Sequence, residues 1–255
     1  MTASTDGAAA GRTRSRRRWI IAIDGPAGSG KSSTARALAR RLGLPYIDTG
    51  AMYRAVTLQA VRDGVPLKDA KRLAAITRGS RIVFRDRNGG GQRVFLNGKD
   101  VSEAIRGPRL TRQVFYLARE PLVRRELVKK QRRLGRSTGG VIEGRDIGTV
   151  VFPRADFKFY FDAHPRVRAR RRYKELRLKG EKVSLREVAR DVTRRDQTDF
   201  SRKVSPLRVA KDAVVIDTSA LTIEETVDRI IALIQSKSLN ARGLNRTRSR
   251  SAARA

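Results

Sequence analysis

Cysteine is absent from this chain of 255 residues, histidine occurs once, and aromatic residues make up 5% of it. The missing cysteines exclude disulfides and thiolate metal sites, and one histidine cannot form a histidine-rich metal centre. No apolar run approaches the roughly 18–20 residues that a membrane-spanning helix needs. The lack of cysteine agrees with a reducing compartment, so we expect a cytoplasmic protein that does not enter a membrane.

Acidic residues are scarce relative to basic ones, because 25 Asp and Glu face 58 Lys and Arg, for a formal net charge of +33. Part of the excess lies in 1–18 and 237–255, where apolar residues are few, and we expect both segments to be disordered basic tails. Such tails favour weak, salt-sensitive contact with RNA, although a solubilising role is the simpler interpretation. The remaining charge lies in the body, 19–236, and predicts a phosphate-rich ligand there.

A glycine-rich stretch, GPAGSGKSS at 25–33, is the strongest motif in the chain. It follows an apolar segment at 19–24 that is typical of a strand and leads into an amphipathic stretch at 31–42 that is typical of a helix. In that context the Gly-x4-Gly-Lys-Ser pattern predicts a loop whose backbone N–H groups surround a nucleoside triphosphate. Lys31 would reach the outer phosphates, and the Ser32 hydroxyl would bind a magnesium ion, the expected cofactor. The predicted triphosphate-binding residues are Gly25, Pro26, Ala27, Gly28, Ser29, Gly30, Lys31, Ser32 and Ser33.

Short apolar segments separated by helical patterns recur along the chain, which is typical of α/β units with parallel strands. We therefore predict a P-loop NTPase-type α/β fold with a five-stranded parallel sheet and flanking helices. Capping boxes at Ser184–Glu187 and Thr222–Glu225 predict the starts of two helices, the second ending near Ser236. One further helix is expected over 110–133, with Pro121 inside it. The five expected strands lie within 19–24, 43–50, 139–143, 156–161 and 213–217.

Two segments depart from this regular pattern. Alternating residues at 81–86 and 93–97 flank a glycine-rich turn, which predicts a β-hairpin in an insert at about 65–110. The helix expected at 165–179 is rich in arginine, and Arg168 and Arg172 share one face of it. A solvated charged helix is one interpretation, but beside a P-loop a mobile arginine lid at about 165–185 is favoured.

Phosphoryl transfer needs positive charge around the migrating group, and this requirement selects the candidate catalytic residues. If 195–202 is helical, its two arginines and Asp199 share a face, so that the carboxylate could brace one arginine while the other faces a phosphate. An acceptor site is less evident. Arg54 and Arg124 suit a monophosphate, because a guanidinium can bind two of its oxygens, but Asp48, Thr49, Arg145 and Asp146 could equally be strand-end caps and turn residues. The candidate catalytic residues are Lys31, Arg168, Arg172, Arg195, Asp199 and Arg202, and the acceptor candidates are Asp48, Thr49, Tyr53, Arg54, Arg124 and Asp146.

Six blocks of sequence, in their order along the chain, carry a resemblance to a known family. The first, IAIDGPAGSGKSS at 21–33, would suit many P-loop kinases. DTGAMYR at 48–54, GRDIGTVVFP at 144–153 and RDQTDFSR at 195–202 are much more specific. Together with LNGKDVSEAIR at 96–106 and KDAVVIDTS at 211–219, they make the chain resemble bacterial cytidylate kinases, a family of nucleoside monophosphate kinases, over about 20–234.

The resemblance implies transfer of the γ-phosphate of ATP to CMP or dCMP, with Mg²⁺, by one kinase domain at 19–236. It implies that 25–33 carries ATP, that the hairpin insert is the monophosphate-binding part, and that the arginine-rich helix is the lid. Glu143 stands where many members have Asp, and Phe115 stands near a position where many carry a small or hydroxyl residue. The residues that match CMP-side positions are Thr49, Tyr53, Arg54, Arg124, Arg145, Asp146, Arg195, Asp199 and Arg202.

Two alternatives stay open at this point. One is a P-loop protein that binds nucleic acid, and the other is a P-loop kinase of another small acceptor. Proteins that bind single strands usually stack bases on aromatic side chains, so the low aromatic content argues against the first. We therefore expect a monomeric kinase with ATP and CMP or dCMP as substrates and, at most, weak RNA contact through its tails.

Overall fold

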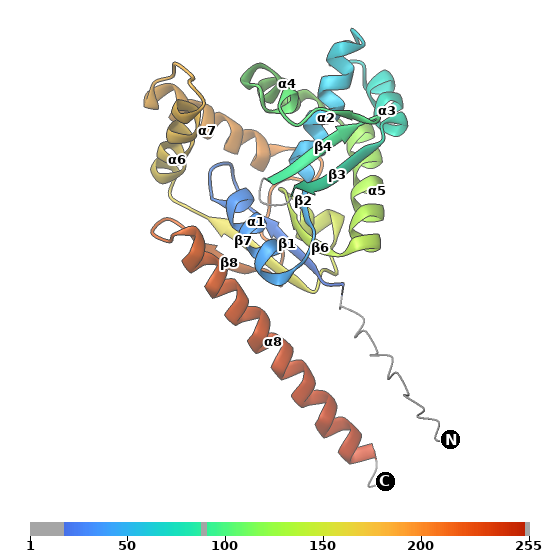
Figure 1. The fold of residues 1–255 in the computed structure, drawn as a ribbon, viewed down its shortest axis with the longest axis vertical. Helices are drawn as coiled ribbons and strands as arrows, with labels where there is room; N and C mark the ends of the chain where they lie inside the picture. The colour runs from blue at the N-terminus through green and yellow to red at the C-terminus, as the bar shows by residue number, and fades with distance from the viewer. Residues whose placement is uncertain (1–17, 88–90, 253–255) are drawn as a thin grey trace, which may run out of the picture.

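A five-stranded parallel sheet forms the centre of the computed structural model, which describes residues 18–87 and 91–252. Its strand order is β2-β6-β1-β7-β8, so β1, which leads into the glycine-rich stretch, is the middle strand (Figure 1). The predicted sheet is confirmed, whereas the tail expected at 1–18 falls almost entirely outside the described residues. The strands are β1 (Ile20–Asp24), β2 (Tyr46–Asp48), β6 (Gly140–Glu143), β7 (Phe157–Asp162) and β8 (Val214–Asp217).

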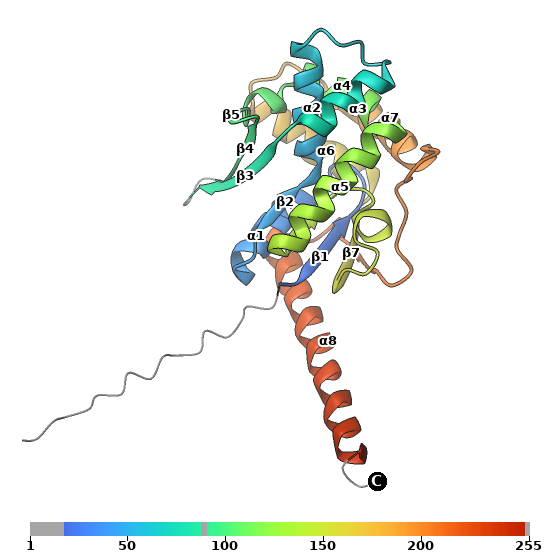
Figure 2. The same cartoon turned by 90° about the vertical axis from the view of Figure 1, so that its right-hand side faces the viewer.

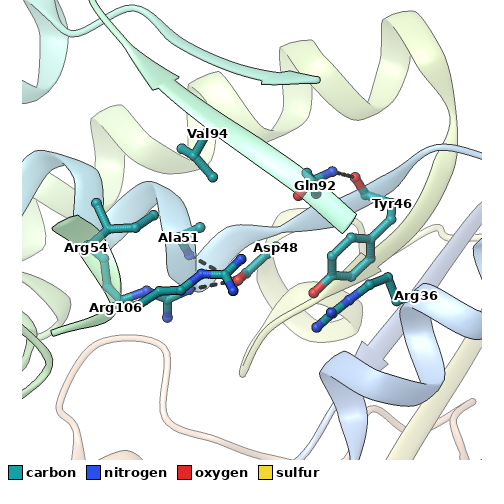
Figure 3. A pocket seen from close by; sticks show the side chains of 9 residues that line it. Arg36, Tyr46, Asp48, Ala51, Arg54, Gln92, Val94 and Arg106 are labelled. Carbon is teal, nitrogen blue, oxygen red and sulfur yellow. Dashed lines mark hydrogen bonds and ion pairs between the residues drawn. The ribbon is translucent and has the colours of Figure 1, made fainter. Parts of the chain in front are cut away.

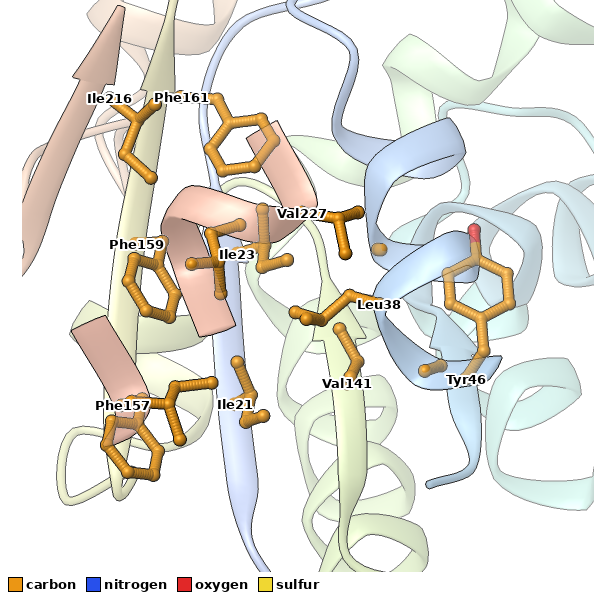
Figure 4. Packing of buried hydrophobic residues seen from close by; sticks show 14 residues of the cluster. Ile21, Ile23, Leu38, Tyr46, Val141, Phe157, Phe159, Phe161, Ile216 and Val227 are labelled. Carbon is orange, nitrogen blue, oxygen red and sulfur yellow. The ribbon is translucent and has the colours of Figure 1, made fainter. Parts of the chain in front are cut away.

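Apolar side chains cover both faces of this sheet, as is usual for parallel strands. Successive residues of β1 point to opposite faces. Ile23 joins a cluster with side chains of α1 (Lys31–Leu42) and α8 (Ile223–Ala252), which Figure 4 shows. Ala22 joins a cluster on the other face with side chains of α5 (Pro121–Thr138). The middle strand is therefore buried on both sides, and its carboxyl end is held in a fixed place.

The predicted hairpin is confirmed and is part of a three-stranded antiparallel sheet. Apolar residues of this sheet, Val94 and Leu96, pack against Ala51 and Ala55, so the insert is attached to the start of the helix that follows β2. Sequence patterns did not predict the helix at 70–79. The elements of this region are α2 (Thr49–Arg62), α3 (Ala70–Gly79), β3 (Ile82–Arg87), β4 (Gly91–Leu96), β5 (Lys99–Asp100) and the short 3₁₀ helix η1 (Ala104–Arg106).

The stretch expected as one helix over 110–133 is two helices, α4 (Pro108–Ala118) and α5. The expectation was wrong because Pro121 has no N–H to donate and occupies the first turn of α5, where no such donor is needed. Glu120 caps α5 by accepting a hydrogen bond from the Leu122 N–H. The break lets the start of α5 turn toward the carboxyl end of β6.

The arginine-rich segment forms α6 (Pro165–Leu178), and the segment after it forms α7 (Leu185–Ser201). The capping box predicted at Ser184 is confirmed, and Arg195 is helical as expected, while Arg202 is the residue that ends α7. In Figure 1 α6 and α7 lie on the left and the insert on the right, with α1 between them. A π-helical turn, η2 (Ile147–Val151), follows β6.

The last helix, α8, is longer than the sequence predicted. Its capping box at Thr222 is confirmed by the reciprocal hydrogen bonds with Glu225. The predicted end near Ser236 and the disorder expected from 237 onward are wrong as far as Ala252, because the helix continues to that residue and leads away from the body (Figure 2). The extension contains no proline that would stop the helix, but it mixes Arg, Ala and Leu with the weaker helix formers Ser, Asn, Thr and Gly. Within 18–87 and 91–252, no helix is both long and apolar enough to cross a membrane.

Candidate active site

The glycine-rich loop between β1 and α1 is held from outside through its carbonyl groups. Ala27 O accepts a hydrogen bond from Arg168 Nη1 at 3.2 Å, and Ser29 O accepts one from Thr218 Oγ1 at 3.0 Å. Inside the loop, Pro26 O accepts from the Ser29 hydroxyl at 3.0 Å. With these carbonyls engaged, the loop is suited to present its N–H groups to an anion at the start of α1.

Two glycines of this loop allow the close approach of neighbouring backbone. Gly25 and Gly28 have φ angles of 144° and 78°, which other residues rarely adopt. A Cβ atom at Gly25 would lie 2.2 Å from Phe161 O, and one at Gly28 would lie 2.9 Å from Arg168 O. The loop therefore cannot keep its shape with larger residues at these positions unless β7 or α6 moves.

Lys31 lies buried at the start of α1, where the motif predicts it. Its Nζ donates hydrogen bonds to Pro26 O and, at 3.2 Å, to Ser29 Oγ. Burial lowers the pKa of Lys31, and repulsion from the nearby Arg145 lowers it further, while Glu143 opposes the shift. The lysine is thus in contact with the loop and within electrostatic reach of an arginine group beside it.

Glu143 ends β6, the neighbour of β1, and its buried carboxylate faces the start of α1. Its Oε1 accepts a hydrogen bond from Tyr46 Oη at 2.6 Å, and Ser32 also hydrogen-bonds to the carboxylate. Burial and the charge of Asp48 raise the pKa of Glu143. Thr49 Oγ1 donates to Glu143 O at 2.7 Å, which ties the start of α2 to the same strand end.

Asp24 is a second buried carboxylate at a strand end, and it connects β1 to η2. Its two oxygens accept hydrogen bonds from the N–H groups of Ile147 and Gly148, at 2.8 and 2.7 Å. Burial raises the pKa of Asp24 to about 7, although these two hydrogen bonds act in the opposite direction. This carboxylate therefore fixes the turn after β6 directly beside the glycine-rich loop.

A buried ion pair lies next to that turn. Arg124 Nη2 donates to Asp146 Oδ2, and the two side chains are only 3% and 8% exposed. Arg124 Nη1 also donates to Ala118 O at 3.0 Å, and the guanidinium carbon lies 5.7 Å from the centre of the Tyr53 ring. Burial opposes the charge of Arg124, but Tyr53 and Asp146 raise its pKa, so the guanidinium stays charged.

Asp199, on the inner face of α7, is surrounded by three arginines. Its Oδ2 accepts a hydrogen bond from Arg145 Nε at 2.7 Å, and its Oδ1 lies 3.9 Å from Arg202 Nη2. Loss of hydration and, to a lesser extent, repulsion from Arg145 together lower the pKa of Arg195 to about 10. One carboxylate cannot neutralise three guanidinium groups, so this part of the site carries excess positive charge.

Several polar atoms in this part of the site are buried without a hydrogen-bond partner within 18–87 and 91–252. The donors among them are Tyr53 Oη, Arg124 Nε, and the Nε and Nη2 atoms of Arg202, whose side chain is 6% exposed; Asp196 Oδ1 is a buried acceptor that also lacks a partner. Buried polar groups are nearly always paired in proteins. An anionic ligand with several oxygen atoms, such as a phosphate ester, would supply the acceptors that these donors lack.

A small pocket opens between α1, the start of α2 and the hairpin insert (Figure 3). Arg54 Nη2 pairs with Asp48 Oδ2 at 2.7 Å on its floor, and Arg36 and Arg106 line its sides. Gln92 of the hairpin donates a hydrogen bond across the pocket to the backbone of β2. Three arginines against one carboxylate again leave positive charge unbalanced.

Comparison with known proteins decides the family. The family model described as cytidylate kinase matches residues 21–236. The chain belongs to the cytidylate kinase family. A cytidylate kinase from Caldanaerobacter subterraneus subsp. tengcongensis is 49% identical over 215 residues, which cover 84% of this chain and 94% of that protein. A cytidylate kinase from Desulfitobacterium hafniense is 48% identical over 217 residues, which cover 85% and 93%. Among solved structures, a shikimate kinase from Bacteroides thetaiotaomicron aligns at 16% identity with a TM-score of 0.45, covering 85% of this chain and 98% of that one.

The cytidylate kinase resemblance drawn from six sequence blocks is thus confirmed, and the structure places the predicted residues of those blocks around one end of the sheet. The loop at 25–33 follows β1, Thr49 follows β2, and Arg145 and Asp146 follow β6. The carboxyl ends of adjacent parallel strands meet at one edge, which explains why segments far apart in the sequence converge there.

The two lid arginines predicted as catalytic have different surroundings. Arg168 is 4% exposed, and its Nη1 lies 2.6 Å from Asp196 Oδ2. Arg172 pairs with Glu175 at 2.7 Å on the surface of the same helix. Arg171, which was not singled out, donates to Thr218 O at 2.6 Å and fixes α6 to the segment after β8. Phosphate contact by Arg168 and Arg172 stays a prediction.

Sequence reasoning missed three charged residues that the structure adds to the site. Asp24 and Asp196 both stand inside the quoted blocks, and a carboxylate at the end of an apolar strand was a usable signal for Asp24. Arg106 also ends a quoted block, at 96–106, but no local signal pointed to the site, because only the fold of the insert brings it near Arg54. Phe115, noted as a departure from the family, is exposed, and the guanidinium of Arg119 lies 4.6 Å from its ring centre.

Proposed function

We propose that this member of the cytidylate kinase family transfers the γ-phosphoryl group of ATP to CMP or dCMP, giving ADP and CDP or dCDP. The observation that carries the proposal is the group of buried, unpaired donor atoms on Tyr53 and Arg202 beside the Arg124–Asp146 pair. These donor atoms lie at the same edge of the sheet as the glycine-rich loop, and an anionic ligand would satisfy them. Two anion sites at one edge are what phosphoryl transfer between two nucleotides requires.

On the donor side, residues 25–33 would hold the ATP phosphates through backbone N–H groups and the dipole of α1. Lys31 lies beside the loop and would move its hydrogen bonds from Pro26 O and Ser29 Oγ to the outer phosphates. Its pKa is lowered by burial and by Arg145, and a bound phosphate would add negative charge to that of Glu143 and so favour the charged lysine.

The residues near Ser32 fit a magnesium ion that is held mainly by phosphates and water. The Ser32 hydroxyl is exposed and hydrogen-bonds to Glu143, whereas no group of three acidic, histidine or cysteine side chains in the described part of the chain could hold a metal by itself. Mg²⁺ usually keeps several waters and takes few protein ligands in such sites. When bound, the ion would neutralise charge on the phosphate oxygens, with Ser32 as its protein ligand.

On the acceptor side, we assign CMP binding to the side chains around the buried ion pair. Arg54 and the arginines near Asp199 would grip the monophosphate, since a guanidinium fork matches phosphate oxygens. Asp199 would orient Arg145, and Arg172 of the lid would approach when α6 and α7 close. The insert at about 65–110 would then act as the monophosphate-binding part and 165–185 as the lid. The full acceptor set is Thr49, Tyr53, Arg54, Arg124, Arg145, Asp146, Arg195, Asp199 and Arg202.

A coupled assay of ADP formation with CMP, dCMP, UMP and AMP as acceptors tests this function. We expect turnover with CMP and dCMP well above that with AMP. If AMP or a non-nucleotide acceptor is phosphorylated faster than CMP, the acceptor assignment is wrong, although the P-loop kinase fold stands.

Three predictions about partners and location have no structural counterpart. We propose a cytoplasmic monomer, which size-exclusion chromatography with light scattering would test for its oligomeric state. We also propose weak RNA contact through the basic ends, because α8 carries Arg242, Arg246, Arg248 and Arg250 past the kinase body. Removing 236–255 should then lower RNA affinity at low salt without lowering CMP turnover.

A further inference from the structure

Helix α7 carries two carboxylates, three residues apart, that contact different sides of the site. Asp199 Oδ2 accepts a hydrogen bond from Arg145, which lies next to the acceptor residue Asp146. Asp196 Oδ2 lies 2.6 Å from Arg168 Nη1, on the side of the glycine-rich loop. Residues three apart are neighbours on a helix surface, so a small rotation around α7 separates the two contacts.

Arg168 is the link between Asp196 and the loop. Its Nε donates to Ala163 O at 2.9 Å, and its Nη1 donates to Ala27 O at 3.2 Å. The residue is 4% exposed, so these protein groups and Asp196 replace its hydration. One guanidinium thus joins α7, the start of α6 and the turn of the glycine-rich loop.

A second contact between α6 and the loop does not involve the guanidinium. Gly28 lies directly against the backbone of Arg168, because a Cβ atom built on Gly28 would be 2.9 Å from Arg168 O and 3.1 Å from Arg168 Cβ. The position of Arg168 therefore affects the loop twice, through the Ala27 carbonyl and through the packing of Gly28. Any change that lets Arg168 shift also releases the loop.

A buried guanidinium needs a counterion to keep its place. Removing the carboxylate of Asp196 would leave the charge of Arg168 with two backbone carbonyls and no anion, which is an unfavourable state for a buried cation. Asp199 is already paired with Arg145, so it cannot take over without breaking the acceptor-side contact. The side chain would then turn toward another anion or toward water, and the Ala27 contact would be lost.

We propose that Asp196 is a positioning residue for the donor nucleotide, because it holds Arg168 against the glycine-rich loop and so keeps that loop in its phosphate-binding shape. This inference rests on the proposed kinase function. It assigns the two carboxylates of α7 to the two substrates, Asp196 to ATP and Asp199 to CMP.

Asp196→Asn tests the assignment, with Asp199→Asn as the mirror variant. We expect Asp196→Asn to raise the KM for ATP by roughly 10–100-fold, the usual weight of a hydrogen bond to a charged group, while the KM for CMP stays within about twofold. Asp199→Asn should show the reverse pattern. Asp191→Asn is the matched control, because Asp191 lies on the same helix in an exposed pair with Arg194 and should leave both constants unchanged.

A binding measurement separates failure of this inference from failure of the proposed function. N-methylanthraniloyl-ATP binding, followed by fluorescence, needs no acceptor and should weaken in Asp196→Asn even if the wild-type chain does not phosphorylate CMP. Absence of CMP turnover in the wild type would refute the function alone. Equal rises in both KM values, a rise for CMP alone, or unchanged analogue binding would refute the role of Asp196.

Two further variants protect the test against a folding defect. Asp196→Glu restores a carboxylate and should recover most of the ATP affinity, which a purely structural loss of Asp196 does not predict. Arg168→Lys keeps the charge but loses the fork that reaches Asp196 and Ala27 together. We expect it to raise the KM for ATP selectively, and a thermal melt like that of the wild type would show that the variant is folded.

Discussion

The two sides of the site are built in different ways. On the donor side, nine consecutive residues form a loop whose carbonyls are bound by Arg168, Thr218 and Ser29. On the acceptor side, single side chains arrive from α2, α5, the turn after β6 and α7, and ion pairs hold them in place. The donor side thus depends mainly on backbone geometry, and the acceptor side on paired charges.

This difference predicts how each side fails. A backbone site loses function when its shape changes, and this loop would have to change shape to accept a Cβ atom at Gly25 or Gly28. A side-chain site loses function when one partner of a buried pair is removed, because the remaining charge keeps its desolvation cost. Lys31 on the donor side and Arg202 on the acceptor side allow the two sides to be tested one residue at a time.

Lys31→Ala should have the largest effect on turnover. It removes the cation that would stabilise the negative charge developing on the outer phosphates during transfer. We expect kcat to fall by roughly 10³-fold, the upper end of the range for loss of one electrostatic donor. The measurement is ADP release with saturating CMP. Lys68→Ala, an exposed lysine of the insert, is the control, and near-normal turnover in Lys31→Ala would contradict the donor assignment.

Arg202→Ala should have the next largest effect and should act on the acceptor side. Two of its buried nitrogens have no hydrogen-bond partner in the described structure, although Nη2 lies 3.9 Å from Asp199 Oδ1, so we expect the guanidinium to bind substrate. Loss of one such donor should lower kcat by roughly 10²-fold, with a much smaller change in the KM for ATP. Arg194→Ala, an exposed arginine of the same helix, should behave as the wild type. If Arg202→Ala instead weakens only ATP binding, Arg202 belongs to the donor side, and its assignment to the acceptor side is wrong.

The same contrast explains how far the sequence could predict this protein. The donor loop was predicted residue by residue, because a backbone site needs consecutive residues and leaves a continuous motif. The five strands were predicted because parallel strands are buried on both faces and appear as short apolar runs. Both signals are local.

The acceptor side could not be derived from local signals. Arg124 and Asp146 are 22 residues apart in the sequence, and only the break at Pro121 aims α5 so that they meet. Spacing therefore left Asp146 as a possible turn residue. Chemistry marked Arg124 as suited to a monophosphate, but only the family resemblance assigned the two residues to CMP. The extension of α8 was missed for a different reason, since the sequence after 236 has no apolar stripe that would indicate a helix.

Arg124→Ala should show that the acceptor side is also a stability element. The variant leaves Asp146 buried without its cation, and breaking a buried pair costs about 3–5 kcal/mol of unfolding free energy. Urea unfolding of the protein without ligands would measure the loss. Arg125→Ala is the matched control. The Arg125 side chain is 60% exposed, so the loss of its ion pair should cost about 0–1 kcal/mol of unfolding free energy. Equal losses in the two variants would contradict the role of the buried pair.

Asp24→Asn should have the smallest effect and tests how the two sides are joined. The pKa of Asp24 is raised from 3.8 in a free aspartate to about 7 in the folded chain, chiefly by burial. Between these two values the folded state binds more protons than the unfolded state, so this group makes the unfolding free energy fall as pH rises from about 4 to 7. From pH 5 to 8 the fall is about 2–3 kcal/mol, at 1.36 kcal/mol for each pKa unit.

Asparagine cannot titrate, so Asp24→Asn should flatten this part of the pH profile, even though it also weakens the hydrogen bonds to Ile147 and Gly148. Urea unfolding at pH 5 and pH 8 gives the change in unfolding free energy with pH for each variant. Comparing these changes cancels the pH-independent loss of stability from the weakened hydrogen bonds. Asp162→Asn, which changes an exposed carboxylate at the end of β7, is measured alongside as the control for replacing one Asp by Asn. If Asp24→Asn keeps the wild-type slope, Asp24 is not the titrating group, and the turn after β6 is held to the donor strand by a carboxylate that stays charged.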